Sequence, residues 1–169
     1  MKSSFGVGSA VGVAAFILSA CADTVPPSAT AAKVEQVACV GATVPPGDAR
    51  LLQATKVLSV EPTYLHDTCA GTSEVTGAKV LVRSPPGVSA ELLARMLQCA
   101  SARATLGRAD PSRLPNDPFG FPGAWVDVDV RPEGDNFVVT LSANSVPNNI
   151  RLVRRATAFL AAQRSVATP

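Results

Sequence analysis

The sequence predicts a small two-layer α+β domain, with two helices on one face of a short β-sheet. A segment rich in Val and Leu, 78–83 ("AKVLVR"), precedes a helix with a well-marked start. Two alternating segments, 125–130 ("WVDVDV") and 137–142 ("FVVTLS"), flank a tight turn and predict a hairpin. A last amphipathic helix follows. The resulting order, β-α-β-β-α over residues 77–164, is typical of helices packed on one side of a sheet.

The first of these helices is expected to begin after Ser89 and to end at Gly107. The Ser89 hydroxyl can accept a hydrogen bond from a backbone N–H of the first turn, and Glu91 lies near the positive end of the helix dipole. Cys99 continues the apolar row of Leu92 and Met96, so we expect its side chain to face the core.

In the hairpin, alternation places Val126, Val128 and Val130 on the buried face and Asp127 and Asp129 on the other. Two carboxylates there are able to bind a cation or to act as acid and base. The pattern favours a solvent-exposed sheet face, where the neighbouring cations pair with them: Lys79, Arg83 and Arg131.

A proline-rich crossing loop over residues 108–124 precedes the hairpin, and Phe119 and Phe121 are expected to pin it to the core. The last helix is expected from Pro147 to Gln163. Its arginines are expected on the solvent face, with contact to an anionic lipid or an acidic partner as the alternative: Arg151, Arg154 and Arg155, with Arg164.

The segment before residue 77 is less regular. A helix is expected over about 49–59, with Asp48 as its N-cap and Pro62 as its stop. The polar residues that follow, 63–77, are expected to form a loop that carries His66, the single histidine.

The chain begins with Lys2 in a short polar segment, followed by an uncharged run over residues 5–18. As a helix these 14 residues reach ~21 Å, short of the ~30 Å hydrocarbon core of a bilayer. The run is therefore typical of a secretory signal peptide.

The run ends in Leu18-Ser19-Ala20-Cys21, which resembles the lipobox of bacterial lipoproteins at every position. The resemblance implies cleavage between Ala20 and Cys21, diacylation of the Cys21 thiol and anchoring in membrane lipid, with palmitate-type acyl chains. Ala22 follows in place of the Asp that often retains lipoproteins at the inner membrane, so the outer membrane, on its periplasmic side, is expected. The alternatives are an ordinary secretory signal or an uncleaved anchor.

These expectations divide the chain into a cleaved signal peptide (1–20), a lipidated cysteine with a flexible tether (21–47), and one α+β domain (48–165). Without the signal peptide, 14 basic residues stand against 13 acidic ones. Such a balance does not suggest a nucleic-acid-binding protein, for which a strongly basic face is expected.

Three cysteines remain if Cys21 is lipidated, and export places them in an oxidising compartment. Cys69–Cys99 is the favoured disulfide, and a pairing with Cys39 is left open. The rival interpretation is a soft-metal (copper or zinc) site formed by His66, Cys69 and Cys99.

No Gly-x-Ser-x-Gly, phosphate-loop or His-Glu-x-x-His motif occurs in the chain. The sequence therefore predicts a membrane-anchored envelope lipoprotein without cofactor or catalytic residues. Its expected role is a non-catalytic binding or structural accessory, with an envelope protein or a small ligand as partner. A hydrolase of unknown type is a further alternative.

Overall fold

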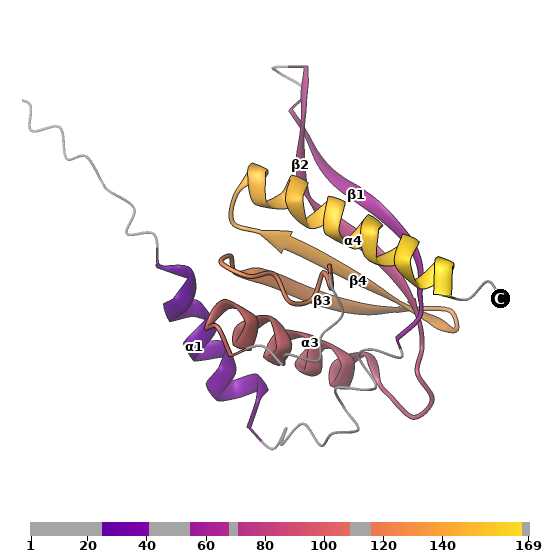
Figure 1. Ribbon diagram of the computed structural model, residues 1–169, viewed down its shortest axis with the longest axis horizontal. Coiled ribbons are helices and arrows are strands. Elements are labelled where there is room, and N and C mark those ends of the chain that lie inside the picture. The colour runs from indigo at the N-terminus through magenta and orange to yellow at the C-terminus, as the bar shows by residue number, and fades with distance from the viewer. Residues whose placement is uncertain (1–24, 41–54, 68–70, 109–115, 167–169) are drawn as a thin grey trace, which may run out of the picture.

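The computed structural model describes residues 25–40, 55–67, 71–108 and 116–166. Four antiparallel strands form one sheet with the order β1-β2-β4-β3, and helices α3 and α4 cover one of its faces, with α1 beside α3 (Figure 1). The elements are α1 (Pro27–Ala38), β1 (Val57–Asp67), β2 (Thr72–Arg83), α3 (Ala90–Thr105), β3 (Val126–Glu133), β4 (Asn136–Ala143) and α4 (Val146–Val166).

The core lies between the sheet and the two covering helices, and the predicted α+β class with both helices on one face is confirmed. Alternate residues of the central strands β2 and β4 face each other in register and are buried, as at Val80 and Val139. The buried face of the predicted hairpin is confirmed as well, because Val126, Val128 and Leu141 join the same cluster. Leucines of α3 and apolar residues of α4 complete it: Leu93, Leu97, Leu152, Ala156, Phe159 and Leu160.

The predicted start of α3 is confirmed, since the Ser89 hydroxyl accepts a hydrogen bond from the Leu92 backbone N–H at 3.2 Å. Met96 and Cys99 are buried as expected. Leu92 itself is 44 % exposed, because the adjacent row of Leu93 and Leu97 faces the sheet.

The expected helix over 49–59 is wrong where the structure describes it: residues 57–59 belong to β1, and residues 49–54 lie outside the described residues. Most of the expected polar loop is also strand, because β1 pairs with β2 from Val57 to Asp67. Pro62 lies within β1 and does not stop a helix. An edge strand tolerates proline because one row of its N–H groups has no strand to bond.

The expected flexible tether over 21–47 is wrong for residues 27–38, which form α1 with Pro27 at its first turn. Ala31 and Ala38 are buried, and Ala31 packs with Ala102 of α3 and with Trp125. Small side chains on both helices permit this close packing, which local sequence preference alone did not reveal.

The disulfide joins Cys39, directly after α1, to Cys99 in α3, with Cα atoms 5.2 Å apart. The favoured Cys69–Cys99 pairing is therefore wrong, and one of the pairings left open is the observed one. Cys69 lies outside the described residues. The packing of α1 on α3 brings Cys39 within bonding distance of Cys99, a contact that spans 60 residues of sequence.

Side chains of helix α3 also form hydrogen bonds along the outer edge of β3. The carbonyl oxygens of Ala124, Val126 and Val128 accept hydrogen bonds from side chains of α3. The donors and their distances are Thr105 Oγ1 at 3.1 Å, Ser101 Oγ at 3.0 Å and Gln98 Nε2 at 3.2 Å, respectively. From Gln98 to Thr105 the helix rises about 10 Å, and from Ala124 to Val128 the chain extends about 13 Å. Because these two lengths are similar, the three side chains can each reach one of the three carbonyls.

The buried hydrogen bond from Ser101 to the Val126 carbonyl predicts a cost for Ser101→Ala. The carbonyl would lose its partner in a buried setting, which should reduce the free energy of unfolding by about 1–3 kcal/mol. Urea denaturation measures the change. The matched control is Thr157→Ala, since the Thr157 hydroxyl bonds a carbonyl on an exposed part of α4. Equal denaturation midpoints for the two variants would contradict this role of Ser101.

The Cys39–Cys99 bond predicts that the domain is less stable when reduced. Removing a cross-link that closes 60 residues should cost roughly 4 kcal/mol in the chain-entropy model. Thermal melts with and without reductant should differ for the wild type and for Cys69→Ser, but not for Cys39→Ser. A Cys39→Ser protein whose melting temperature still falls on reduction would refute the pairing.

Candidate functional site

The alternative metal site is not assembled in the structure. Cys99 is bonded to Cys39, so its sulfur is not a thiolate, and the His66–Cys69–Cys99 ligand set is wrong. His66 is exposed in β1, where its Nδ1 lies 2.8 Å from the Ser73 hydroxyl of β2 and its ring stacks on Tyr64. Within the described ranges, no group of three or more His, Cys, Asp or Glu side chains is placed to hold a metal ion.

The two aspartates of the hairpin lie on the uncovered sheet face, as predicted, and line a shallow hollow of about 240 Å³. Trp125 donates its indole N–H to Asp127 at 2.8 Å. Arg131 pairs with Asp129 at 2.7 Å, as expected. Lys79 pairs instead with Glu133, at 3.6 Å. Both carboxylates thus have partners. The hollow places hydroxyl groups beside them, from Thr140 and Ser142, but apolar side chains also line it: Val34, Trp125 and Val128.

The arginines of α4 divide into two groups. Arg151 and Arg154 are exposed, as expected, but Arg155 is half-buried and its guanidinium donates to the carbonyls of Asp117 (3.1 Å) and Gly120 (3.4 Å). Arg151 and Arg155 also lie over the Phe121 ring, 5.1 and 5.6 Å from its centroid.

Arg155 was expected on the solvent face, and that expectation is wrong because the crossing loop folds back over α4. Phe119 and Phe121 pin this loop, as predicted, with 2 % and 1 % of their surface exposed. Arg164 likewise has a structural bond, from its Nη2 to the Leu58 carbonyl. Two of the four arginines therefore have structural roles. Arg155 holds the crossing loop, and Arg164 bonds strand β1.

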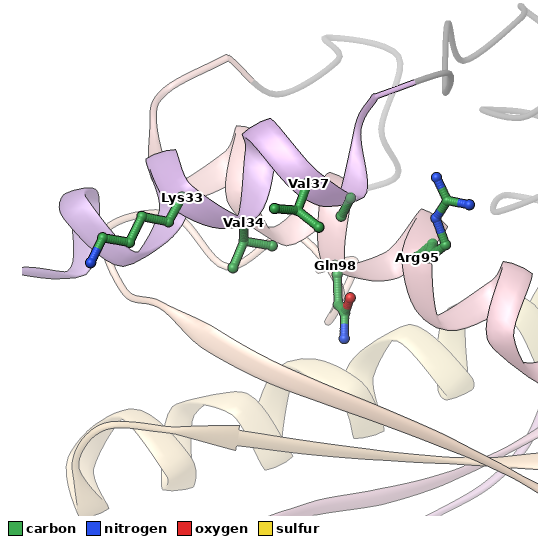
Figure 2. Close-up of a pocket in the computed structure, with 6 residues that line it drawn as sticks. Lys33, Val34, Val37, Arg95 and Gln98 are labelled. Atoms are coloured by element: carbon green, nitrogen blue, oxygen red, sulfur yellow. The ribbon is translucent and has the colours of Figure 1, made fainter.

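A hollow of about 370 Å³ lies between α1 and α3, and sequence reasoning missed it (Figure 2). Figure 2 shows Lys33 and Arg95 at opposite ends of the row, with Val34 and Val37 between them. Gln98 and Ala38 complete the lining. One signal was present in the sequence: Ala31, Val34 and Ala38 are spaced i, i+3, i+7, as in an amphipathic helix.

Exposed apolar side chains also occur on the outer part of the β1–β2 hairpin. Tyr64 and Leu65 are 50 % and 62 % exposed. Here β1 and β2 continue past the segment of β2 that pairs with β4, which starts at Ala78. Figure 1 shows this part of the hairpin projecting beyond the sheet. We call residues 63–67 and 72–77 the hairpin arm.

The lipidation and cleavage residues expected from the sequence, Ala20 and Cys21, lie outside the described residues. Of the helices that the structure describes, none is both long and apolar enough to span a bilayer. Comparison of the chain with models of protein families, with curated proteins and with solved structures finds no match.

The bonds of Arg155 predict that it matters more for stability than its neighbour. Arg155→Ala should lower the free energy of unfolding by about 2–3 kcal/mol, because two charge-assisted hydrogen bonds to the loop are lost. Arg154→Ala, on the exposed side of the same helix turn, should change it by less than about 0.5 kcal/mol. Urea denaturation of both variants tests this. Equal losses in the free energy of unfolding would contradict the role of Arg155 in holding the loop.

Proposed function

We propose that the protein is a lipid-anchored lipoprotein of the bacterial cell envelope, with a domain that serves as a non-catalytic binding or structural accessory. The observation that carries the anchor is the Leu18-Ser19-Ala20-Cys21 motif behind an uncharged run of 14 residues. Two or three acyl chains on Cys21 hold a protein firmly at a membrane, whereas one holds it only marginally. Because Ala22 follows Cys21, the outer membrane is the proposed destination.

The disulfide supports export by an argument independent of the signal peptide. Stable structural disulfides form in oxidising compartments such as the periplasm and are rare in the cytosol of mesophiles. Cys99, with 2 % of its surface exposed, is held in the domain interior, so the bond is part of the packing.

The accessory role is supported by how the polar side chains are engaged. The groups most able to do chemistry each make a structural contact: His66 with Ser73, Asp127 with Trp125, and Asp129 with Arg131. The hairpin arm exposes one large apolar side chain on each of its two faces, Tyr64 and Leu65, which an envelope protein can contact.

The anchor predicts that Cys21→Ser abolishes incorporation of radiolabelled fatty acid and leaves uncleaved precursor. Cys69→Ser is the matched control, because it also removes one thiol but should be labelled and cleaved normally. Autoradiography and intact mass measure both. Normal labelling of Cys21→Ser would rule out the lipobox.

The intact mass of the wild type, purified from its membrane, gives the complementary result. We expect a chain that starts at Cys21, carries diacylglycerol, and has one thiol open to alkylation before reduction and three after it. A chain without acyl mass would overturn the proposed anchor, and three thiols open before reduction would overturn the disulfide.

A further inference from the structure

The outward side of α1 is apolar in its centre. Lys33, Gln36 and Val37 are spaced i, i+3, i+4, so they share one side of the helix, and Val40 follows two residues after the helix ends. Val37 and Val40 are 77 % and 67 % exposed, the highest values among the large apolar residues of the described chain. The α1 face, as we use the term, consists of Lys33, Val37 and Val40, with Arg95 of α3 across the hollow.

Cations stand at the two ends of this face (Figure 2). Lys33 lies at one end of the hollow. Arg95 lies at the other, where its Nη2 donates to the Val40 carbonyl at 3.2 Å. Glu35, the acidic residue of α1, forms ion pairs with Arg108 (2.8 Å) and Arg103 (3.9 Å). The hollow is therefore lined by apolar and cationic groups without a carboxylate.

The distance from the proposed anchor to this helix is short. Only five residues lie between Cys21 and Pro27, the first residue of α1, so six Cα–Cα steps join them. A chain extends at most ~3.3–3.6 Å per residue, so α1 begins within roughly 20 Å of the lipidated sulfur. This length keeps the start of α1 near the lipid headgroups, and the rest of the helix, about 18 Å long, can lie along them.

We propose that the α1 face rests on the anionic lipid surface that holds the anchor. Lys33 and Arg95 pair with headgroup phosphates, and Val37 and Val40 enter the interfacial region between them. A helix with apolar residues flanked by cations is suited to lie in that interface, and a modest basic contact suffices when acyl chains already hold the protein there. The inference rests on the proposed lipid anchor and adds the orientation of the domain.

The lysines of the mature chain allow a direct test, because only Lys33, Lys56 and Lys79 remain after residues 1–20 are removed. Lys79 lies on the uncovered face of the sheet, where it pairs with Glu133. The lipidated protein is placed on vesicles containing phosphatidylglycerol, or on vesicles of phosphatidylcholine alone, and treated with a water-soluble amine reagent. Mass spectrometry then gives the labelling rate at each lysine.

We expect the rate at Lys33, relative to Lys79, to be at least fivefold lower on the phosphatidylglycerol vesicles than on phosphatidylcholine. Val37→Asp should restore labelling of Lys33, because it places a negative charge in the centre of the face. The matched control is Leu65→Asp on the hairpin arm, which makes the same kind of change at an equally exposed site and should leave Lys33 protected.

Equal relative rates on the two kinds of vesicle would overturn the inference, and so would protection that survives Val37→Asp. Protection in native membranes but not on lipid vesicles would mean that a protein covers the α1 face, which also overturns it. The failure of the anchor is distinct: a protein without acyl mass that washes off the vesicles overturns the proposed lipoprotein and this orientation together.

Discussion

The arrangement of the domain depends on helix α3 lying along the edge of β3. Its polar residues Gln98, Ser101 and Thr105 meet three carbonyls along one edge of the hairpin, while Leu93 and Leu97 enter the core. A single helix thus satisfies backbone groups at a sheet edge and covers apolar surface. The same contacts prevent that edge from pairing with another strand, a common hazard of open sheets.

The position of α3 also determines where α1 lies. Ala102 provides space for Ala31, and Cys99 reaches Cys39 from the same helix. The N-terminal segment is therefore fastened to the domain at Ala31 and Cys39, 10 and 18 residues after the proposed anchor. With the proposed anchor at Cys21, this arrangement would couple the domain closely to the membrane, and the α1 face would have a short covalent path to lipid.

On the same face of the sheet, over β1 and β2, α4 has a comparable role. Arg155 holds the crossing loop through two carbonyls, and Gln163 bonds the backbone at both Thr55 and Val57, where β1 begins. Long polar side chains thus connect segments that are distant in sequence. Since these groups stabilise the fold, the part of the chain that the structure describes offers three other surfaces for binding: the hairpin arm, the hollow beside Asp127 and Asp129, and the α1 face.

The sequence by itself determined the β3–β4 hairpin, α3 and α4, because strict alternation, an N-cap serine and a helical apolar row are local signals. The proposed lipobox also rests on a local signal, the Leu18-Ser19-Ala20-Cys21 motif after an uncharged run. Only the tertiary structure decided that residues 57–59 are strand, that Cys39 is the partner of Cys99, and that Arg155 bonds the crossing loop. Each of these depends on a partner at least 20 residues away, and the free energy of such contacts appears only when the whole sheet and its helices pack together.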